Sequence, residues 1–282
     1  MNKIPNMNCQ FTNSISIILV NYNGADFIIN CLNSLEKYIG KDNCEIIIAD
    51  NNSQDSSIDI IENQFPCIKL IKLPKNVGFG GGNNAGAKIA TGEFLFLLNT
   101  DTILIENTPE LLSHYLHQNQ DVGVVSSRIT FEDGSYQLSC GKLPNLIIEF
   151  IDKLRYGLDR KWHSIFSSLY DKQNSSTKEV GWVTGACLMI RRDIFEKLGG
   201  FDESFFMYFE DKDLCKRVHD AGFKVVYYPK TSLIHLLGGS SQSVKTSVNS
   251  YYRDSQLYYY QKHLGKFQTP ILKIYLRFTG KI

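Results

Sequence analysis

The chain has 282 residues, of which 43% are hydrophobic and 21% charged, a composition typical of a globular protein with a sizeable core. Its thirty basic and twenty-nine acidic side chains leave a formal net charge of +1, which argues against a nucleic-acid-binding surface or a strongly charged partner. No apolar run reaches the roughly 18 residues of a membrane span, and the N-terminal stretch lacks a signal-peptide core. We therefore expect a cytoplasmic protein that binds no nucleic acid.

Seven cysteines are scattered along the chain without a Cys-x-x-Cys pair. An odd number of isolated cysteines predicts free thiols in a reducing compartment, in preference to disulfides or a zinc site.

Short apolar runs alternate with amphipathic stretches through the first third of the chain. The runs are continuous, as expected of strands that are covered on both faces, and lie at 14–21, 45–50, 68–73 and 93–99. Candidate helices between them lie at 25–39, 55–64 and 83–91. This pattern predicts the α/β class, with a mostly parallel central sheet flanked by helices.

Each predicted strand ends in polar residues. In an open α/β sheet, ligands bind at the carboxyl ends of the strands, so we expect these residues to form the rim of one pocket. They are Asn21, Tyr22, Asn23, Asp50, Asn51, Asn52, Ser53, Asn76, Asn99, Thr100 and Asp101.

The stretch GFGGGNNAG, residues 78–86, predicts a loop that lets a ligand approach the backbone, because four glycines in five positions exceed what a tight turn needs. Residues 80–85 also fit the dinucleotide fingerprint G-x-G-x-x-G/A, with Asp101 about 20 residues further on. That fingerprint belongs to the first β-α turn, whereas this stretch follows the third predicted strand. A nicotinamide-dependent oxidoreductase is therefore a disfavoured alternative, and a turn without a ligand is another.

Two aspartates at strand ends have both a structural and a ligand-binding interpretation. The run from Asp50 to Ser53 could cap a helix, or Asp50 could accept the N–H of a pyrimidine base with the asparagines near a ribose. Asp101 could cap the helix near Pro109, or it could bind a hard divalent cation that neutralises a diphosphate.

The second half of the chain has a helix predicted from Asp211 to Gly222. The pair Glu210-Asp211 at its start is favoured there by the helix dipole alone. The preceding aromatic run, residues 205–209, would alternatively raise a carboxylate pKa toward that of a useful base. His235 is by default a buried structural histidine, and its alternative role is a metal or phosphate ligand.

The C-terminal tail after residue 240 is rich in tyrosine and basic residues. Beyond Pro270, the spacing predicts a helix with an apolar face and a basic face, formed by Ile271, Ile274, Tyr275 and Phe278 and by Lys273, Arg277 and Lys281. Such a helix could lie on an anionic membrane, or it could pack on the protein with its basic face in water. The tyrosines at 251–260 could line the interface of a homodimer or pack against the core.

Six segments in chain order resemble the family-2 glycosyltransferases of the rhamnosyltransferase-like group, over about residues 14–240. They are SIILVNYNG, ADNNSQD, KNVGFGGGNNAG, FLFLLNTD, GWVTGACLMIRRDIFEKLGGFDESFFMYFEDKDLCKRVHDAG and SLIHLLGGSS. The resemblance implies the GT-A fold in residues 1–240, with a nucleotide-binding part at about 14–131, an acceptor-side part at about 132–240 and a helical extension at 241–282. It also implies a nucleotide-diphosphate sugar donor, Mg²⁺ or Mn²⁺, and inversion at the anomeric carbon.

The resemblance implies a role for individual residues as well. Asp211 matches the general base, with Glu210 orienting the acceptor or supporting the helix end and an exchange of these roles left open. Asp101 matches the metal-binding aspartate, with His235 as a further ligand, while Asn99 replaces the aspartate that many relatives carry. The acceptor-side residues are Trp182, Thr184 and Gly185. The donor-side residues are Asn21, Tyr22, Asn23, Asp50, Asn51, Asn52, Asn76, Gly78, Phe79, Gly80, Gly81, Gly82, Asn83, Asn99, Thr100 and Asp101.

The function that follows is inverting transfer of a dTDP- or UDP-linked sugar to a saccharide or lipid-linked saccharide in surface polysaccharide synthesis. Membrane binding by the tail would place the protein at the inner face of the cell membrane. A non-catalytic carbohydrate-binding protein on the same fold is a third alternative, which only Asn99 favours.

Overall fold

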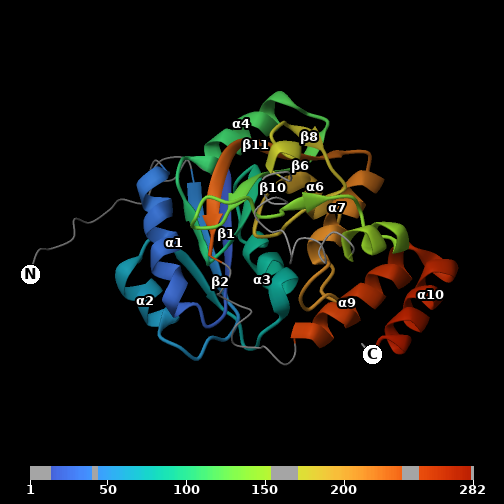
Figure 1. Cartoon of the computed structure of the whole chain (residues 1–282). Helices are drawn as coiled ribbons and strands as arrows, with labels where there is room; N and C mark the ends of the chain where they lie inside the picture. The colour runs from blue at the N-terminus through green and yellow to red at the C-terminus, as the bar shows by residue number, and fades with distance from the viewer. Residues whose placement is uncertain (1–13, 40–43, 154–170, 237–247, 281–282) are drawn as a thin grey trace, which may run out of the picture.

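The computed structural model describes residues 14–39, 44–153, 171–236 and 248–280. A central sheet lies between two layers of helices, and a helical pair at the C-terminus packs to one side (Figure 1). The sheet has the strand order β3-β2-β1-β4-β10-β6-β11-β5, with β8 paired to β11 outside this path. The α/β class predicted from the apolar runs is therefore confirmed.

The first four strands are parallel, as predicted, and the rest of the sheet is mixed. They are β1 (Ile15–Asn21), β2 (Cys44–Asp50), β3 (Lys69–Lys72) and β4 (Phe94–Asn99). The remaining strands of the sheet are β5 (Thr102–Leu104), β6 (Val122–Thr130), β8 (Lys178–Glu179), β10 (Cys187–Arg191) and β11 (Lys224–His235). Strand β10 starts at the carboxyl edge and runs back from it, so it is antiparallel to β4 and β6. A separate two-stranded sheet pairs β7 (Cys140–Gly141) with β9 (Trp182–Val183).

Helices cover both faces of the sheet. One face is packed by α1 (Ala25–Tyr38), α2 (Ser57–Gln64) and α4 (Thr108–Gln118), and the other by α3 (Gly78–Ala87), α6 (Arg192–Lys197) and α7 (Glu210–Asp220). Successive side chains of a strand point to opposite faces, so Ile17 and Leu19 join the first layer while Ile18 joins the second. This arrangement explains why the strands are continuously apolar.

The glycine-rich stretch is a helix, and the prediction of a loop at 78–86 is wrong. Helix α3 begins at Gly78 and packs directly on β1. A Cβ atom on Gly82 would lie 2.7 Å from Val20 Cγ1, and one on Gly86 would lie 2.5 Å from Ile18 Cγ2. Glycine disfavours an isolated helix by roughly 1 kcal/mol per residue, but here it allows close packing of helix on sheet. Tertiary contact therefore overrides local propensity.

Five cysteines are free and buried, namely Cys31, Cys44, Cys140, Cys187 and Cys215. Cys67, by contrast, is disulfide-bonded. The prediction of free thiols is therefore wrong for Cys67.

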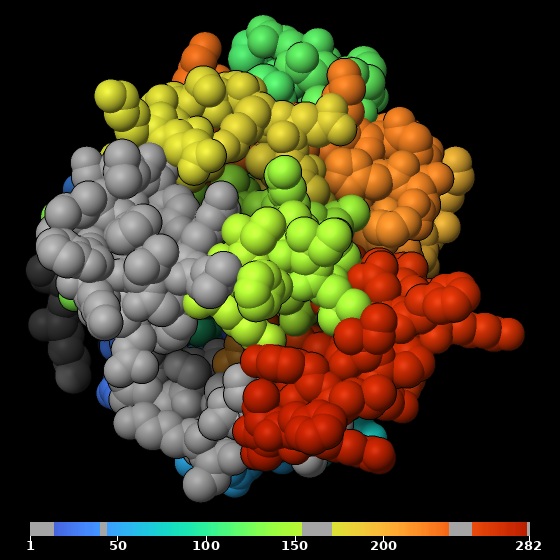
Figure 2. Space-filling view, turned by 45° about the vertical axis from the view of Figure 1, so that its right-hand side comes forward, coloured from blue at the N-terminus to red at the C-terminus, as the bar shows by residue number. Residues whose placement is uncertain are grey.

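The C-terminal helices α9 (Val248–His263) and α10 (Gly265–Phe278) pack on each other and on the aromatic run before α7. Their shared core contains Phe205, Phe209, Tyr259, Tyr260, Leu272 and Leu276. The helical segment 146–153 lies against them, as the green and red atoms of Figure 2 show. The tyrosines of α9 thus pack against the protein, which supports the second of their two interpretations. The expected domain boundary at 240 and the side chain of Lys281 lie outside the described residues.

Helix α10 contacts the protein through a face that the sequence analysis did not identify. Its buried residues are Thr269, Leu272 and Leu276, whereas Ile271, Ile274 and Phe278 of the predicted apolar face are exposed. The helix therefore packs on the protein, as one alternative predicted, but with a different face, and part of the predicted apolar face is exposed together with Arg277. In the described part of the chain, no helix has the length and apolar character needed to span a membrane.

Candidate active site

A buried polar cluster joins the carboxyl ends of β1 and β2. Asn21 Nδ2 donates to Asp50 Oδ1 at 2.7 Å, to Ser53 Oγ at 3.1 Å and to Ser57 Oγ at 2.8 Å. Asp50 also accepts from the Ser53 backbone N–H and hydroxyl, so both of its oxygens are engaged and the side chain has no exposed surface. In this structure Asp50 holds the strand ends together, and its contact with a nucleotide base remains a prediction.

Strained backbone is concentrated at the candidate site. Among the described residues, the non-glycine positions with positive φ are Asn23 and Asn52 at 50° and 66°, and Tyr208 and Phe209 at 71° and 68°. Asparagine tolerates this conformation, but for aromatic residues it costs on the order of 1–3 kcal/mol each. The first two residues follow β1 and β2, and the other two immediately precede Glu210. Strain of this kind typically marks functional sites.

Strand pairing brings the predicted metal ligands together. In the ladder of β11 with β5, His235 is opposite Thr102, the neighbour of Asp101. His235 Nε2 lies 3.1 Å from Asp101 Oδ1, and its Nδ1 lies 3.0 Å from Gln137 Oε1. An amide oxygen only accepts, so the Gln137 contact favours a proton on Nδ1, the tautomer in which Nε2 is able to bind a metal ion.

The geometry of this pair fits a divalent cation. Adjacent ligands of an octahedral ion with bonds of about 2.1 Å lie about 3 Å apart, close to the separation of His235 Nε2 and Asp101 Oδ1. Asn99 places Nδ2 at 3.4 Å from His235 Nε2. The ranges that the structure describes hold no group of three or more His, Cys, Asp or Glu side chains able to bind a metal. Among the described residues, we assign Asp101 and His235 as the two candidate ligands.

The two carboxylates at the start of α7 differ in environment. Glu210 is buried, and its Oε2 atom has no hydrogen-bond partner among the described residues. Burial, together with the charge of neighbouring Asp211, raises the pKa of Glu210 to about 8. Asp211 is partly exposed and accepts from the Gly185 N–H at 3.3 Å and from the Lys212 N–H at 2.8 Å. Burial thus favours the protonated form of Glu210 at neutral pH, and we expect Asp211 to be the base.

The start of α3 contacts the aromatic run before this pair. Gly78, with φ of 80°, packs so closely that a Cβ atom would lie 2.2 Å from the Phe206 carbonyl oxygen. The Phe79 N–H donates to the same oxygen at 3.2 Å, and a Cβ atom on Gly185 would lie 2.8 Å from the Phe79 ring. Gly78 therefore allows a close approach to the backbone, as predicted, but in this structure the group that approaches is the Phe206 carbonyl.

Three asparagines predicted to lie along the donor hold the start of α3. Asn51 Nδ2 donates to the Gly78 carbonyl at 3.0 Å, and Asn76 Oδ1 accepts from the Gly78 N–H at 2.9 Å. Asn83 Nδ2 donates to the Phe79 carbonyl at 3.0 Å, while its buried Oδ1 has no partner among the described residues. Their contact with a ribose or diphosphate remains a prediction.

The acceptor-side residues lie between the two charged clusters. The Asn99 N–H donates to the Ala186 carbonyl at 3.1 Å. The residue before Ala186 is Gly185, whose N–H donates to Asp211. Two hydrogen bonds to adjacent residues therefore connect Asn99 with Asp211. Lys212 Nζ lies 4.9 Å from the centre of the half-buried Trp182 ring. Sequence reasoning missed Lys212, although it directly follows Asp211. It also missed Gln137, for which the sequence held no signal.

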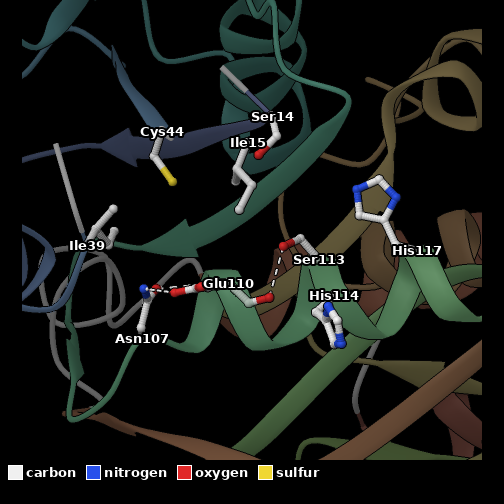
Figure 3. A pocket seen from close by; sticks show the side chains of 9 residues that line it. All are labelled: Ser14, Ile15, Ile39, Cys44, Asn107, Glu110, Ser113, His114 and His117. Carbon is white, nitrogen blue, oxygen red and sulfur yellow. Dashed lines mark hydrogen bonds between the residues drawn. The ribbon is translucent and has the colours of Figure 1, made fainter. Parts of the chain in front are cut away.

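A hollow of about 240 Å³ lies at the opposite edge of the sheet (Figure 3). It is lined by the first residues of β1 and β2 and by α4, namely Ser14, Ile15, Ile39, Cys44, Asn107, Glu110, Ser113, His114 and His117. Hydrogen bonds within α4 engage Glu110 and His114. Burial and the nearby Glu110 raise the pKa of Cys44 to about 12, which makes it a poor nucleophile. The candidate catalytic residues remain those at the carboxyl edge of the sheet.

Solved structures with the same arrangement define the class of protein. The mannosyltransferase PcManGT from Pyrobaculum calidifontis, solved with GDP-Man and Mn²⁺, matches with a TM-score of 0.59 at 16% identity, over 90% of this chain and 65% of that one. TarS residues 1–349 from S. aureus, solved with UDP, match with a TM-score of 0.58 at 16% identity, over 86% of this chain and 65% of that one. The fold is that of the GT-A glycosyltransferases.

Sequence comparison then identifies the family. Residues 16–199 match the model of glycosyl transferase family 2, and residues 155–276 match that of glycosyl transferase family group 2. Since the first match covers more than half of the chain, the protein belongs to glycosyl transferase family 2.

Two relatives carry rhamnosyltransferase names. N-acetylglucosaminyl-diphospho-decaprenol L-rhamnosyltransferase of Mycobacterium tuberculosis is 23% identical over 92% of this chain and 88% of its own length. Rhamnosyltransferase WbbL of Escherichia coli is 26% identical over 78% of this chain and 83% of its own length. The predicted family, fold and enzyme class are confirmed, and neither an oxidoreductase nor a non-catalytic protein is supported.

Proposed function

We propose that this glycosyltransferase moves a sugar from a dTDP- or UDP-linked donor to a lipid-linked saccharide, with inversion at the anomeric carbon. The observation that carries the proposal is the pair Glu210 and Asp211 at the start of α7, of which the first is buried and the second partly exposed. The Asp101–His235 pair lies at the same edge of the sheet. The name of the M. tuberculosis relative supports a lipid-linked acceptor and a deoxyhexose donor.

In the proposed reaction, Asp211 accepts the proton of an acceptor hydroxyl as that oxygen bonds to C1 of the donor sugar. The bond between C1 and the diphosphate oxygen breaks, and the diphosphate leaves with its electron pair. Asp211 is oriented for this step by the Gly185 N–H. Glu210, protonated at neutral pH, would donate a hydrogen bond to the acceptor through Oε2, which has no hydrogen-bond partner among the described residues.

Asp101 and His235 would hold Mg²⁺ or Mn²⁺, and a bound cation there would stabilise the charge of the leaving diphosphate. Asp101 is 7% exposed and His235 8% exposed, so the pair is shielded from bulk water. Gln137 would keep His235 in the tautomer that binds metal. Asn99 supplies no charge to the site, so we expect the cation to bind firmly only together with the diphosphate.

Thermal stabilisation by UDP, dTDP, GDP and NAD, each with and without Mn²⁺, tests this proposal, because a ligand that binds only the folded state raises the melting temperature. We expect a Mn²⁺-dependent shift with UDP or dTDP that His235→Ala reduces. His114→Ala, on the opposite edge, is the control. A shift with NAD alone, indifferent to metal, would contradict the proposal.

We further propose peripheral contact with an anionic membrane. Of the twelve large apolar side chains exposed among the described residues, eight lie on α10 and the adjacent segment 146–153. These residues, here called the apolar surface, are Ile147, Phe150, Ile151, Phe267, Ile271, Ile274, Tyr275 and Phe278. Helix α10 contains Lys266, Lys273 and Arg277 and no acidic residue. An exposed apolar face flanked by basic residues is typical of helices that lie on anionic lipid.

A further inference from the structure

The segment from Asp202 to Asp213, here called the catalytic turn, includes the catalytic pair and the left-handed residues Tyr208 and Phe209. Backbone in this conformation persists only where the surrounding structure holds it. The structure that holds the catalytic turn is the C-terminal helix α9, which the sequence analysis had treated as a separate extension.

Helix α9 contacts the catalytic turn at both ends and in the middle. Lys262 Nζ lies 2.7 Å from Asp202 Oδ2 and 2.7 Å from Asp213 Oδ1, so one ammonium group joins the two ends. Ser255 Oγ donates to the Met207 carbonyl between them at 2.8 Å. Aromatic rings of α9 pack on the same segment. The ring pairs are Phe205 with Tyr258, Phe206 with Tyr251, Tyr208 with Tyr252, and Phe209 with Tyr252 and Tyr259.

Among the described side chains, Asp213 has three charged or hydrogen-bonding partners, two of which belong to α9. It has no exposed surface and lies 2.7 Å from His263 Nε2 and 2.8 Å from Arg217 Nε, in addition to Lys262. Burial opposes the charged form, but the hydrogen bond from His263 and the charge of Arg217 outweigh it and lower the pKa of Asp213. A buried carboxylate that loses a partner is strongly destabilised, so the place of Asp213 depends on α9.

We infer that Lys262 and His263 are positioning residues for the base Asp211 and act through Asp213. Asp213 and Asp211 lie two residues apart in the first turn of α7, so a shift of one displaces the other. The inference rests on the proposed function, which gives Asp211 its role. It makes the C-terminal helices part of the catalytic apparatus.

Lys262→Met, with Lys216→Met as its matched control, tests the inference. Lys216 pairs with Asp220 at the other end of α7 and has nearly the same exposure, 27% against 26%. In Lys262→Met we expect kcat to fall about 10- to 100-fold with the KM for the donor within about twofold, because the base moves while the donor site does not. An equal kcat in both variants would overturn the inference.

His263→Gln and His263→Leu separate positioning from packing. Glutamine keeps an N–H close to the place of Nε2, whereas leucine removes the donor to Asp213. We expect Gln to retain most of kcat, whereas Leu, which leaves Asp213 with one partner fewer, should lose kcat and lower the melting temperature. Equal kcat values in the two variants would mean that His263 does not act through its hydrogen bond.

Hydrogen exchange gives a readout that does not depend on turnover. In Lys262→Met, the amides of residues 207–213 should exchange faster than in the unmodified protein, since the catalytic turn opens more often. Unchanged exchange would refute the inference even if transfer were lost. If the unmodified protein transfers no sugar from any donor, the proposed function fails, while the exchange result still decides whether α9 holds the turn.

Discussion

In the proposed reaction, the chemical step depends on Asp211. It is partly exposed at the start of α7 and oriented by the Gly185 N–H, while its neighbour Glu210 is buried. The sequence predicted both carboxylates but left an exchange of roles open. The proposed roles of base and hydrogen-bond donor are assigned from the burial of each carboxylate. Burial depends on how α7 packs, and the order Glu-Asp in the sequence does not determine it.

Replacing Asp211 by Asn should lower kcat about 10²- to 10⁴-fold, the usual contribution of a general base, because the amide cannot accept the proton. Donor affinity, measured by calorimetry with the nucleotide-sugar, should stay nearly unchanged. Asp220→Asn, at the exposed far end of the same helix, is the control. Retention of normal turnover by Asp211→Asn would show that another group is the base.

The raised pKa of Glu210 predicts a pH dependence of stability. Its pKa rises from 4.5 to about 8 on folding, so the folded state holds a proton that the unfolded state releases. The stability from this proton is fully present below about pH 4.5 and is lost as the pH rises through 8. The free energy of unfolding in urea should therefore fall more steeply between about pH 5 and pH 9 in the unmodified protein than in Glu210→Gln. Glu196→Gln, at an exposed site, should keep the steeper slope, and identical slopes in all three would contradict the prediction.

At the scale of elements, the tests concern helix α3. Helix propensity alone predicts that Gly82→Ala stabilises the protein by about 1 kcal/mol. The contact with Val20 predicts the opposite, a loss of about 1–3 kcal/mol, since a Cβ atom would lie 2.7 Å from Cγ1. Chemical denaturation should show the loss, and Val20→Ala in the double variant should remove part of it. A more stable Gly82→Ala protein would mean that close packing is not why glycine occupies this helix.

The elements differ in how far the sequence predicts them. The apolar runs of β1, β2 and β4 and the periodicity of α1 and α7 are local patterns, and the structure confirms these elements. The sequence predicts a loop where α3 begins, because its glycines are explained by contacts with residues distant in the chain, which include Val20 of β1, Phe201 and Phe206. Likewise, β11 pairs with β5 in a register that the sequence does not reveal, and this pairing places His235 beside Asp101.

At the scale of the whole molecule, the apolar surface is the feature to test. Removing residues 270–282 would uncover the core that Leu272 and Leu276 cover, so point substitutions are the better test. The double variant Ile274→Ser, Phe278→Ser should lose most of its co-sedimentation with vesicles containing phosphatidylglycerol, because both side chains are exposed and their loss removes apolar area. The matched control is Ile89→Ser, an exposed apolar residue elsewhere.

Substitution of the basic residues of α10 distinguishes two partners for the apolar surface, an anionic membrane and a second copy of the chain. Lys273→Gln with Arg277→Gln should weaken binding to anionic vesicles and leave the weak binding to neutral phosphatidylcholine unchanged. If the variants change the sedimentation coefficient in the absence of lipid and leave vesicle binding intact, the apolar surface is an interface between copies of this chain.

The sequence by itself determined the α/β class and the family, and it supplied the candidate residues for the chemistry, because strand burial and motif residues are recorded in short segments of chain. Tertiary structure alone decided which carboxylate is buried, why the glycines are there, which atoms face Asp101, and that α9 holds the catalytic turn. Each of these depends on contacts between segments far apart in the chain. Burial and close approach arise only when those segments meet, so no local pattern encodes them.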